Sequence, residues 1–323
     1  MKVVVTGATG FVGGALVRAL LADGHEVVGV KRPSATTTLQ HPNLTWRSGD
    51  VTDPASLRSL FDEADSLIHA AGMLGQAGVP ESDYLKLHEQ GTYNILAEAE
   101  KAGVGRVLYV SSPGVLGPIS SSPADETTPL APSNPYERSK AAAEQVAQVY
   151  ASAGLPVIIA RPEFIYGPTD LHVLGLFKAV RDGRFFTING GHNTCHPTYI
   201  DDAVLGMLLA LRNGRSGEIY HITGPKPVTF RELGQRIAAA LDVPSPKLNL
   251  PHWLAWLGAA GLEIGMGLIN KRPPLSRTGV AFFSEDRRFS WQKAHDELGY
   301  TPQFDLELGV AETVAWYREN GLV

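Results

Sequence analysis

The sequence predicts an α/β protein built on a doubly wound parallel sheet, with a smaller, mixed C-terminal part. From residue 1 to about 165, short β-branched runs alternate with stretches whose apolar residues recur at helical spacing. The runs are continuously apolar, which is typical of strands buried on both faces. The first run also breaks directly into a loop with three glycines that opens a helical stretch.

The predicted strands are, in order, KVVVTG, EVVGV, LTWRSG, DSLIHAAG, RVLYVSS and PVIIARP. The first helix is GFVGGALVRALLADGH, with Leu16, Leu20 and Leu21 on one face. Past Pro162 the chain is richer in glycine, proline and aromatic residues, but HPTYIDDAVLGMLLALRNG and GEIYHITG predict a helix and a strand that return to the sheet. The last predicted helix is DLELGVAETVAWYRENG. We therefore expect a sheet domain over 1–165 and about 198–224, and a second domain over 166–197 and 225–323.

The composition narrows the classes of partner. The chain of 323 residues has 28 Lys and Arg against 33 Asp and Glu, without a basic tract that could neutralise a phosphate backbone. Nucleic acid is therefore not an expected partner. The single cysteine, Cys195, excludes an internal disulfide and a zinc site built on several cysteines, and we expect no bound metal. Because a strand starts right after Met1 and Lys2, we expect no signal peptide and a cytoplasmic protein.

The glycine loop is a candidate nucleotide-binding element. Gly7, Gly10 and Gly13 follow the first buried strand and open a helix, so unpaired N–H groups at the helix N-terminus would face a pyrophosphate. Gly7 would allow a tight turn, Gly10 a close approach of the phosphates, and Gly13 a close contact between helix and strand. The sequence therefore predicts a dinucleotide site.

The ends of the next two strands indicate which dinucleotide. Lys31 and Arg32 stand where an acidic residue would grip the adenosine ribose of NAD, and both could pair with a 2′-phosphate. Asp50 ends the third strand, where its carboxylate could accept a hydrogen bond from the adenine amino group. NADP is thus favoured, and NAD stays open.

A candidate acid–base pair follows in SNPYERSKAAAEQ. Asn134 can cap a helix that carries Tyr136 and Lys140 four residues apart, on one face. An ammonium beside a phenol favours its ionised form and would lower its pKa toward neutrality. Ser111 and Ser112 end the fifth strand, at the edge where a doubly wound sheet builds its site. A serine there could hydrogen-bond a substrate oxygen while the tyrosine exchanges its proton.

This order of glycine loop, serine at a strand end and Tyr-x-x-x-Lys resembles the extended branch of the short-chain dehydrogenase/reductase superfamily, the NAD-dependent epimerase/dehydratase family. The resemblance covers essentially the whole chain, including RPEFIYGP, HPTYIDDAV and the C-terminal WQKAHDELGY. It implies a Rossmann-type cofactor domain and a substrate domain, with Ser112, Tyr136 and Lys140 as the catalytic residues. With the two basic residues added, the predicted cofactor contacts are Gly7, Thr9, Gly10, Phe11, Val12, Gly13, Lys31, Arg32, Asp50, Val51, Ala70, Ala71, Gly72, Tyr136, Lys140 and Pro162.

One departure from the family pattern leaves a role open: His88 stands where members usually have asparagine. Three further features bear on the reaction, and the first is the apolar stretch 251–270, which would cover a lipophilic substrate better than a diphosphate. Pro113 and Gly114 stand where dehydratases of the family have an acid pair, and neither can exchange a proton, so dehydration is disfavoured. Cys195 stands where enzymes of sugar nucleotides often have an arginine, so a bidentate diphosphate ligand is missing.

These features are most similar to the group of 3β-hydroxysteroid dehydrogenases and dihydroflavonol reductases. We therefore expect reversible hydride transfer between NADP(H) and a secondary alcohol or ketone on a mainly apolar, sterol-, flavonoid- or lipid-like substrate. The expected substrate contacts are Met73, Pro113, Glu163 and His196. One alternative is a nucleotide-sugar epimerase, with a diphosphate ligand from Arg161, Arg184 or Arg277. Another is a binding protein that senses NADP(H) without a substrate of its own.

The stretch 251–270, PHWLAWLGAAGLEIGMGLIN, is largely apolar over close to the length that spans a bilayer. We expect a buried or lid-like helix, with peripheral membrane contact as the alternative and a true span as the least favoured reading. The family resemblance also leaves a homodimer open, since related enzymes frequently pair through two long helices of each subunit.

Overall fold

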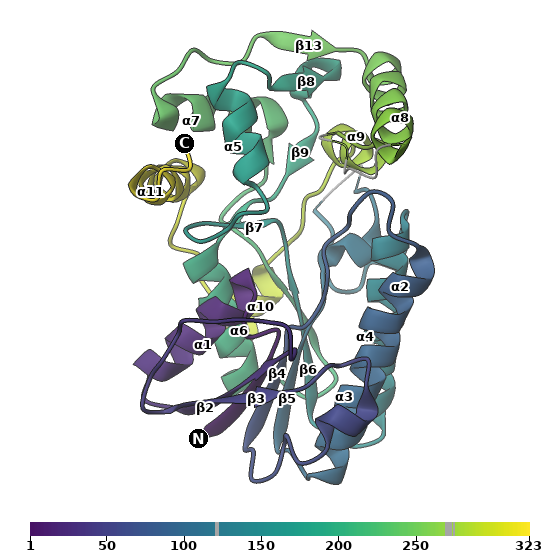
Figure 1. Ribbon diagram of the computed structural model, residues 1–323, viewed down its shortest axis with the longest axis vertical. Coiled ribbons are helices and arrows are strands. Elements are labelled where there is room, and N and C mark those ends of the chain that lie inside the picture. The colour runs from purple at the N-terminus through teal and green to yellow at the C-terminus, as the bar shows by residue number, and fades with distance from the viewer. Residues whose placement is uncertain (120–122, 269–272, 274) are drawn as a thin grey trace.

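The computed structural model describes residues 1–119, 123–268, 273 and 275–323 and contains one seven-stranded parallel sheet (Figure 1). The strand order is β11-β6-β5-β4-β1-β2-β3, so the order reverses at β1, between β2 and β4. This reversal makes the sheet doubly wound and confirms the predicted fold class. The strands are β1 (Lys2–Thr6), β2 (Glu26–Lys31), β3 (Leu44–Ser48), β4 (Ser66–His69), β5 (Arg106–Val110), β6 (Val157–Pro162) and β11 (Ile219–Ile222).

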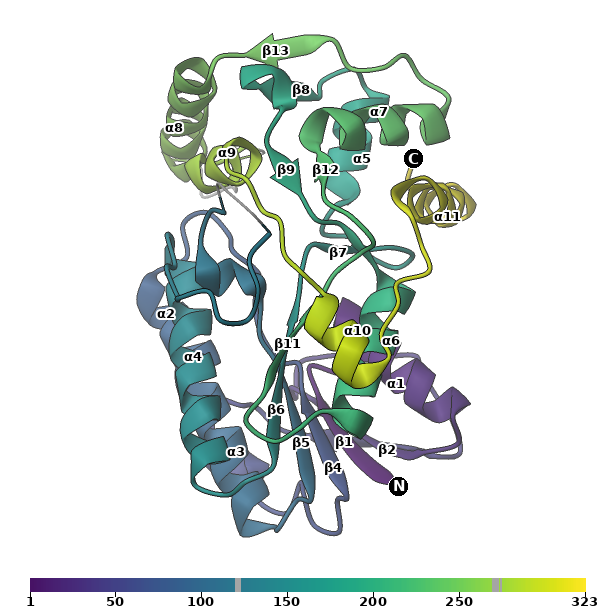
Figure 2. The same ribbon diagram turned by 180° about the vertical axis from the view of Figure 1, so that it is seen from behind.

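Helices cover both faces of the sheet (Figures 1 and 2). The helices α1 (Phe11–Ala22) and α6 (Ile200–Asn213) pack on one face, and α3 (Gly91–Lys101) and α4 (Pro135–Ser152) pack on the other. Val3, Val4 and Val5 are completely buried, and they point alternately into the two cores. Continuous apolar runs therefore mark strands with two buried faces, as the sequence predicted.

The connections are less regular than the strands. No helix lies between β2 and β3, and only the short 3₁₀ turn η1 (Pro54–Leu57) lies between β3 and β4. The connection from β4 to β5 contains α2 (Glu81–Leu85), a π-helical turn η2 (Lys86–Gln90) and α3. A second 3₁₀ turn, η3 (Pro113–Leu116), directly follows the serines at the end of β5.

As predicted, α6 and β11 return to the sheet, where β11 pairs with β6. Most of the rest of the C-terminal half lies at the carboxyl ends of the strands (Figure 1), whereas α10 (Gln292–Leu298) packs against α6 and β11 (Figure 2). It contains three two-stranded pairs: β7 (Ile165–Tyr166) with β10 (Thr198–Tyr199), β9 (Thr194–Cys195) with β12 (Val228–Thr229), and β8 (Phe186–Ile188) with β13 (Leu248–Leu250). The remaining elements are α5 (Leu174–Arg181), η4 (Asn189–Gly191), α7 (Phe230–Leu241), α8 (His252–Leu268), α9 (Arg277–Ser284) and α11 (Leu306–Glu319).

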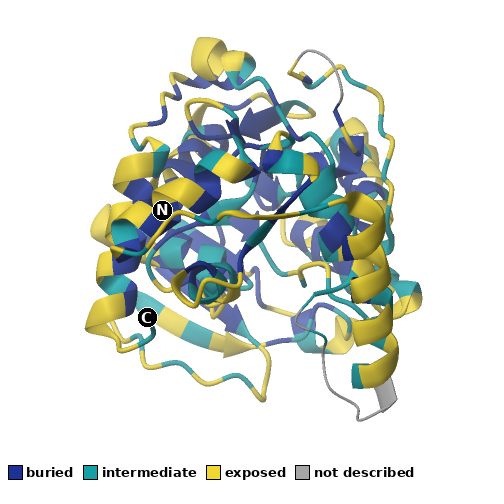
Figure 3. Cartoon of the chain, turned by 90° about the horizontal axis from the view of Figure 1, so that it is seen from above, coloured by how far each residue is buried: buried dark blue, intermediate teal, exposed yellow. Residues whose placement is uncertain are grey.

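Helix α8 lies on the surface, so of the two expected arrangements, buried or lid-like, the buried one is wrong (Figure 3). Its buried positions are Ala255 and Ala259, whereas Trp253, Leu257 and Ile264 are 63%, 54% and 70% exposed. The small residues Ala255 and Ala259 face the protein, where they cluster with Ile188 and Val280, and large apolar residues face outward. Residues 269 and 270 of the predicted stretch lie outside the described residues. Of the helices that the structure describes, none combines the length and apolarity needed to cross a membrane.

Candidate active site

The glycine loop after β1 has the geometry that a dinucleotide requires. Gly7 has a φ of 69°, and a Cβ there would stand 2.6 Å from the carbonyl oxygen of Ala70. A Cβ on Gly13 would stand 2.2 Å from the carbonyl oxygen of Gly7. Gly10 caps α1, and within the described chain no side chain fills that cap. The first N–H groups of α1 are therefore open to an anion, and the cradle fits a pyrophosphate.

The predicted adenosine contacts lie at the ends of neighbouring strands. Lys31 ends β2 and donates from Nζ to the carbonyl oxygen of Ala35 at 3.2 Å, and Arg32 beside it is exposed. Asp50 lies just past β3, where the Thr52 N–H donates to its Oδ1 at 2.9 Å. This hydrogen bond, helped by the positive charge of Arg32, lowers the pKa of Asp50, so the carboxylate stays ionised at neutral pH.

The other predicted cofactor residues lie along the same edge of the sheet. The N–H of Ala71 donates to the hydroxyl of Thr6 at 3.2 Å, which ties the loop after β4 to the end of β1. Because parallel strands end at one edge, the structure brings these segments together from distant parts of the sequence. The remaining predicted cofactor residues are Thr9, Phe11 and Val12 in and after the glycine loop, Val51 after β3, Ala70, Ala71 and Gly72 after β4, and Pro162 at the end of β6.

Helix α4 carries Tyr136 and Lys140 on its first two turns. The side chain of Asn134 caps the helix by accepting from the N–H of Glu137 at 3.0 Å, as predicted. The Glu137 carboxylate reaches back to the N–H of Ser133 at 2.7 Å and so fixes the first turn a second time. Ser112 starts η3 and accepts from the N–H of Gly114 at 3.2 Å.

The electrostatics of Tyr136 differ from the sequence-based expectation. Burial raises the pKa of Tyr136 to about 12, a hydrogen bond with Ser112 opposes that rise, and the charges of Glu163 and Glu137 add to it. Lys140 instead donates from Nζ to the carbonyl oxygen of Val110 at 2.8 Å. Its ammonium is therefore not what sets the pKa of the phenol here, and Tyr136 is protonated at neutral pH.

Lys140 is itself an unusual cation. Burial lowers the pKa of Lys140 to about 8, and the negative charge of Glu144 partly opposes this decrease. The ammonium lies 4.7 Å from the centroid of the Tyr109 ring, at a distance typical of a cation–π contact. It is thus held at the carboxyl end of β5, one turn below Tyr136 on α4.

Three charged side chains, Glu137, Glu163 and Arg287, form a cluster near Tyr136. Glu137 accepts from Nη2 of Arg287 at 2.8 Å, and both residues are buried. The Arg287 Nε is buried and has no hydrogen-bond partner within the described part of the chain. Burial raises the pKa of Glu163 to about 7, although the charge of Arg287 lowers it. Sequence reasoning missed Glu137 as a charge partner and Arg287 altogether, because 150 positions separate them and no motif joins them.

The predicted substrate residues have different surroundings. Met73 donates its N–H to His88 at 3.0 Å, and Pro113 and Glu163 are buried near Ser112 and at the end of β6. His196 has both ring nitrogens engaged, with the carbonyl oxygen of Gly224 at 2.9 Å and the N–H of Phe289 at 3.3 Å. It is also 1% exposed, so it presents almost no surface to a substrate.

The three arginines considered as diphosphate ligands are all paired with carboxylates. Arg161 is completely buried and binds its partner at 2.5 and 3.0 Å, which removes it from any ligand site. The pairs are Arg161 with Glu144, Arg184 with Asp182, and Arg277 with Glu263.

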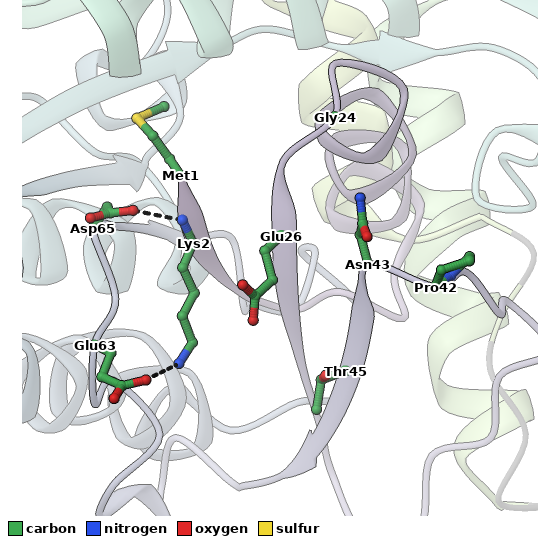
Figure 4. A pocket seen from close by; sticks show the side chains of 9 residues that line it. All are labelled: Met1, Lys2, Gly24, Glu26, Pro42, Asn43, Thr45, Glu63 and Asp65. Carbon is green, nitrogen blue, oxygen red and sulfur yellow. Dashed lines mark hydrogen bonds and ion pairs between the residues drawn. The ribbon is translucent and has the colours of Figure 1, made fainter.

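A shallow depression lies at the opposite end of the sheet and has no part in this site (Figure 4). It is lined by the amino ends of β1, β2 and β3. Lys2 crosses it, donating its N–H to Asp65 at 2.7 Å and its ammonium to Glu63 at 3.3 Å. None of the predicted site residues lines it.

Comparison with known proteins agrees with this geometry. Residues 3–223 match the model of the NAD dependent epimerase/dehydratase family. A 2-alkyl-3-oxoalkanoate reductase of Stenotrophomonas maltophilia is 32% identical over 96% of this chain and 97% of its own. Sterol demethylase protein B of Methylococcus capsulatus is 29% identical over the full length of both chains. DesIV, a dTDP-glucose 4,6-dehydratase from Streptomyces venezuelae solved with NAD bound, has a TM-score of 0.81 at 31% identity, over 99% of this chain and 98% of that one.

The matched family is NAD-dependent, and its members among these relatives include named reductases and dehydratases. The match spans more than half of the chain and contains the glycine loop, Ser112, Tyr136 and Lys140. The protein is therefore an enzyme of the NAD-dependent epimerase/dehydratase family, the extended branch of the short-chain dehydrogenases/reductases.

Proposed function

We propose that this enzyme transfers hydride reversibly between NADP(H) and a secondary alcohol or ketone on a mainly apolar substrate. The proposal depends mainly on one observation: Ser112 and Tyr136 are present, but the acid pair of the dehydratases is not. Pro113 and Gly114 occupy its two positions, and neither side chain can transfer the proton needed to eliminate water from a substrate. In this proposal, 1–165 with about 198–224 binds the cofactor, and 166–197 with 225–323 encloses the substrate.

The protonated state of Tyr136 suits the reducing direction. Its phenol would donate its proton to the carbonyl oxygen as the carbon–hydrogen bond forms, and the Ser112 hydroxyl would donate a hydrogen bond to the same oxygen. The bound nicotinamide would supply the hydride, so the ketone gains one hydride and one proton. Lys140, with a pKa of about 8, would hold the nicotinamide ribose and reprotonate the site.

Two observations favour an apolar substrate over a nucleotide sugar. Arg161 is buried and paired with Glu144, and Cys195 is completely buried, so neither position presents a diphosphate ligand, while Arg184 and Arg277 lie in exposed ion pairs. Two relatives are named for an alkyl oxoalkanoate and a sterol, both largely apolar molecules. Met73, Pro113 and Glu163 are the substrate contacts that we propose.

The preference for NADP rests on Lys31 and Arg32 at the end of β2. Both are basic, and the exposed Arg32 could pair bidentately with a 2′-phosphate. An acidic side chain that would accept from a 2′-hydroxyl is missing at these two positions. NAD is the alternative coenzyme.

The proposal is tested by following NADPH oxidation with long-chain 3-oxo acids and sterol ketones, and by assaying dTDP-glucose and UDP-glucose for dehydration and epimerisation. We expect net oxidation of NADPH with the ketones, and neither dehydration nor epimerisation of the two sugar nucleotides. Fast epimerisation of a sugar nucleotide without net cofactor turnover would instead establish the epimerase alternative. Binding of NADPH with turnover of neither class would favour the sensor.

The outward face of α8 suggests how an apolar substrate is reached. We propose that this face contacts an anionic membrane surface: Trp253 and Trp256 are exposed, and both are residues that favour the membrane interface. Between residues 245 and 280 the sequence has four basic residues, Lys247, Lys271, Arg272 and Arg277, against the single acid Glu263. In a co-sedimentation assay with phosphatidylglycerol vesicles, the wild-type protein should appear in the vesicle pellet, and the Trp253→Gln/Ile264→Gln variant should stay in the supernatant. Equal amounts of both proteins in the vesicle pellet would refute the proposal that this face of α8 contacts the membrane.

The exposed side of α3 and α4 suggests a homodimer. Tyr93 and Val149 are 51% and 67% exposed, and Tyr93 packs edge-on against Tyr150 at 6.1 Å between ring centroids. We propose that a second copy covers this face. Light scattering should give the mass of a dimer, and Val149→Lys should give a monomer; a wild-type protein that is monomeric would contradict it.

A further inference from the structure

His88 lies in the π-helical turn η2, between α2 and α3. A π-helical turn contains one residue more than an α-helical turn, is rare, and occurs mostly at functional sites. The wider turn directs the imidazole between two segments, the loop after β4 and helix α4. His88 is 2% exposed and stands where members of the family usually have asparagine.

The two ring nitrogens of His88 have different partners, and these fix the tautomer. Nε2 accepts from the N–H of Met73 at 3.0 Å, so Nε2 carries no proton. The proton is therefore on Nδ1, which donates to the hydroxyl of Ser139 at 2.8 Å. That hydroxyl donates in turn to the carbonyl oxygen of Tyr136 at 2.7 Å. A continuous chain of hydrogen bonds thus joins the loop after β4 to the backbone of Tyr136.

The imidazole also packs against the reactive ring. His88 and Tyr136 lie edge to face, with ring centroids 5.8 Å apart and an interplanar angle of 81°. Tyr84 lies 5.9 Å from His88 and 6.2 Å from Tyr136, which closes a triangle of rings. Burial, with the charge of Lys140 added, lowers the pKa of His88 to about 3, so the ring stays neutral and keeps this hydrogen-bond pattern.

We propose that His88 is a positioning residue with two separable functions: Nε2 holds the cofactor loop 70–73 through Met73, and Nδ1 holds Tyr136 through Ser139. An asparagine cannot serve both partners, because its amide ends about where Nδ1 lies and does not reach Met73. A glutamine amide extends to about the position of Nε2 and loses Ser139. The inference rests on the proposed function, because it assigns a positioning role to a residue beside Tyr136, the proposed proton donor.

The variants His88→Asn and His88→Gln therefore separate the two functions. We expect His88→Asn to keep kcat within about threefold and to weaken NADPH binding, measured by fluorescence titration, by about tenfold. We expect His88→Gln to keep NADPH binding and to lower kcat by about tenfold, with the pKa of Tyr136, followed by NMR of ¹³C-labelled tyrosine, shifted from the wild-type value.

The matched controls are His295→Asn and His295→Gln on α10, where the imidazole lies 3.1 Å from the carbonyl oxygen of Tyr300. Both should leave all these measurements unchanged. Equal losses in the two His88 variants, or no loss in either, would overturn the proposal. If the enzyme reduces none of the ketones tested, the proposed function fails, but the NADPH titration and the tyrosine NMR still decide whether His88 has two separate functions.

Discussion

Two regions meet at Tyr136. The region that we propose as the cofactor side consists of the glycine loop 7–13 and the ends of β2 to β4, and the region that we propose as the substrate side consists of Glu137, Glu163 and Arg287. On the cofactor side the key contacts are made by backbone, such as the approach of Gly13 to the carbonyl oxygen of Gly7. On the substrate side they are made by charged side chains, such as the 2.8 Å pair of Arg287 and Glu137. The two regions should therefore respond differently to substitution.

The largest effect is expected where the two regions meet. Tyr136→Phe removes the phenolic proton but keeps the ring between His88 and Tyr84, so kcat should fall by about 10³-fold while NADPH affinity changes by less than about threefold. Stopped-flow reduction and fluorescence titration measure the two quantities. Tyr150→Phe, at the far end of the same helix, is the control and should retain full activity. Retained turnover in Tyr136→Phe would remove the proton donor from the mechanism.

On the substrate side, Arg287→Met should lower the free energy of unfolding by about 3 kcal/mol, because it leaves the buried Glu137 carboxylate without its cation. Urea denaturation measures the loss. The double variant Arg287→Met/Glu137→Gln should recover part of it, since the buried Glu137 charge is then removed and Glu285, the more exposed partner of Arg287, is the carboxylate that loses its cation. NADPH affinity should stay at the wild-type value in both. Equal stability of the single and double variants would show that the pair is not coupled.

This contrast also explains what the sequence could predict. The strands, the glycine loop and the helix of Tyr136 are specified by local patterns, and the structure contains each of them. Arg287 lies in EDRRF, a stretch with no motif, and meets Glu137 only through the tertiary fold. For helix α8 the buried alternative of the expectation was wrong, because its apolar residues occur on all sides and periodicity cannot tell which side faces the protein.

The pH dependence of stability tests Glu163. Its pKa is raised from 4.5 to about 7 in the folded protein, so between these values the folded state binds more protons than the unfolded state. Stability from this group is therefore full below about pH 4.5 and is lost as the pH rises to about 7. Glu163→Gln should be as stable as the wild type near pH 4.5 and more stable by up to about 3 kcal/mol at pH 8.

The measurement for Glu163→Gln is urea denaturation across that pH range, compared with Glu319→Gln on the exposed end of α11, which should follow the wild type. A difference between Glu163→Gln and wild type that does not change with pH would mean that Glu163 has the same pKa in the folded and the unfolded protein, so that it is ionised at neutral pH. The substrate side would then hold a permanent negative charge beside Tyr136.

The smallest effect is expected at the outer edge of the cofactor side. Arg32 is exposed, so a pair with a 2′-phosphate forms in high dielectric, and Arg32→Ala should raise the Kd for NADPH by only about tenfold. The Kd for NADH should not change, because NADH carries no 2′-phosphate, and the loss for NADPH should shrink as salt is added. The control is Arg236→Ala, which removes the exposed ion pair between Arg236 on α7 and Glu307 on α11 and should alter neither Kd. Equal losses for the two coenzymes would mean that Arg32 does not recognise the phosphate, and would favour NAD as the coenzyme.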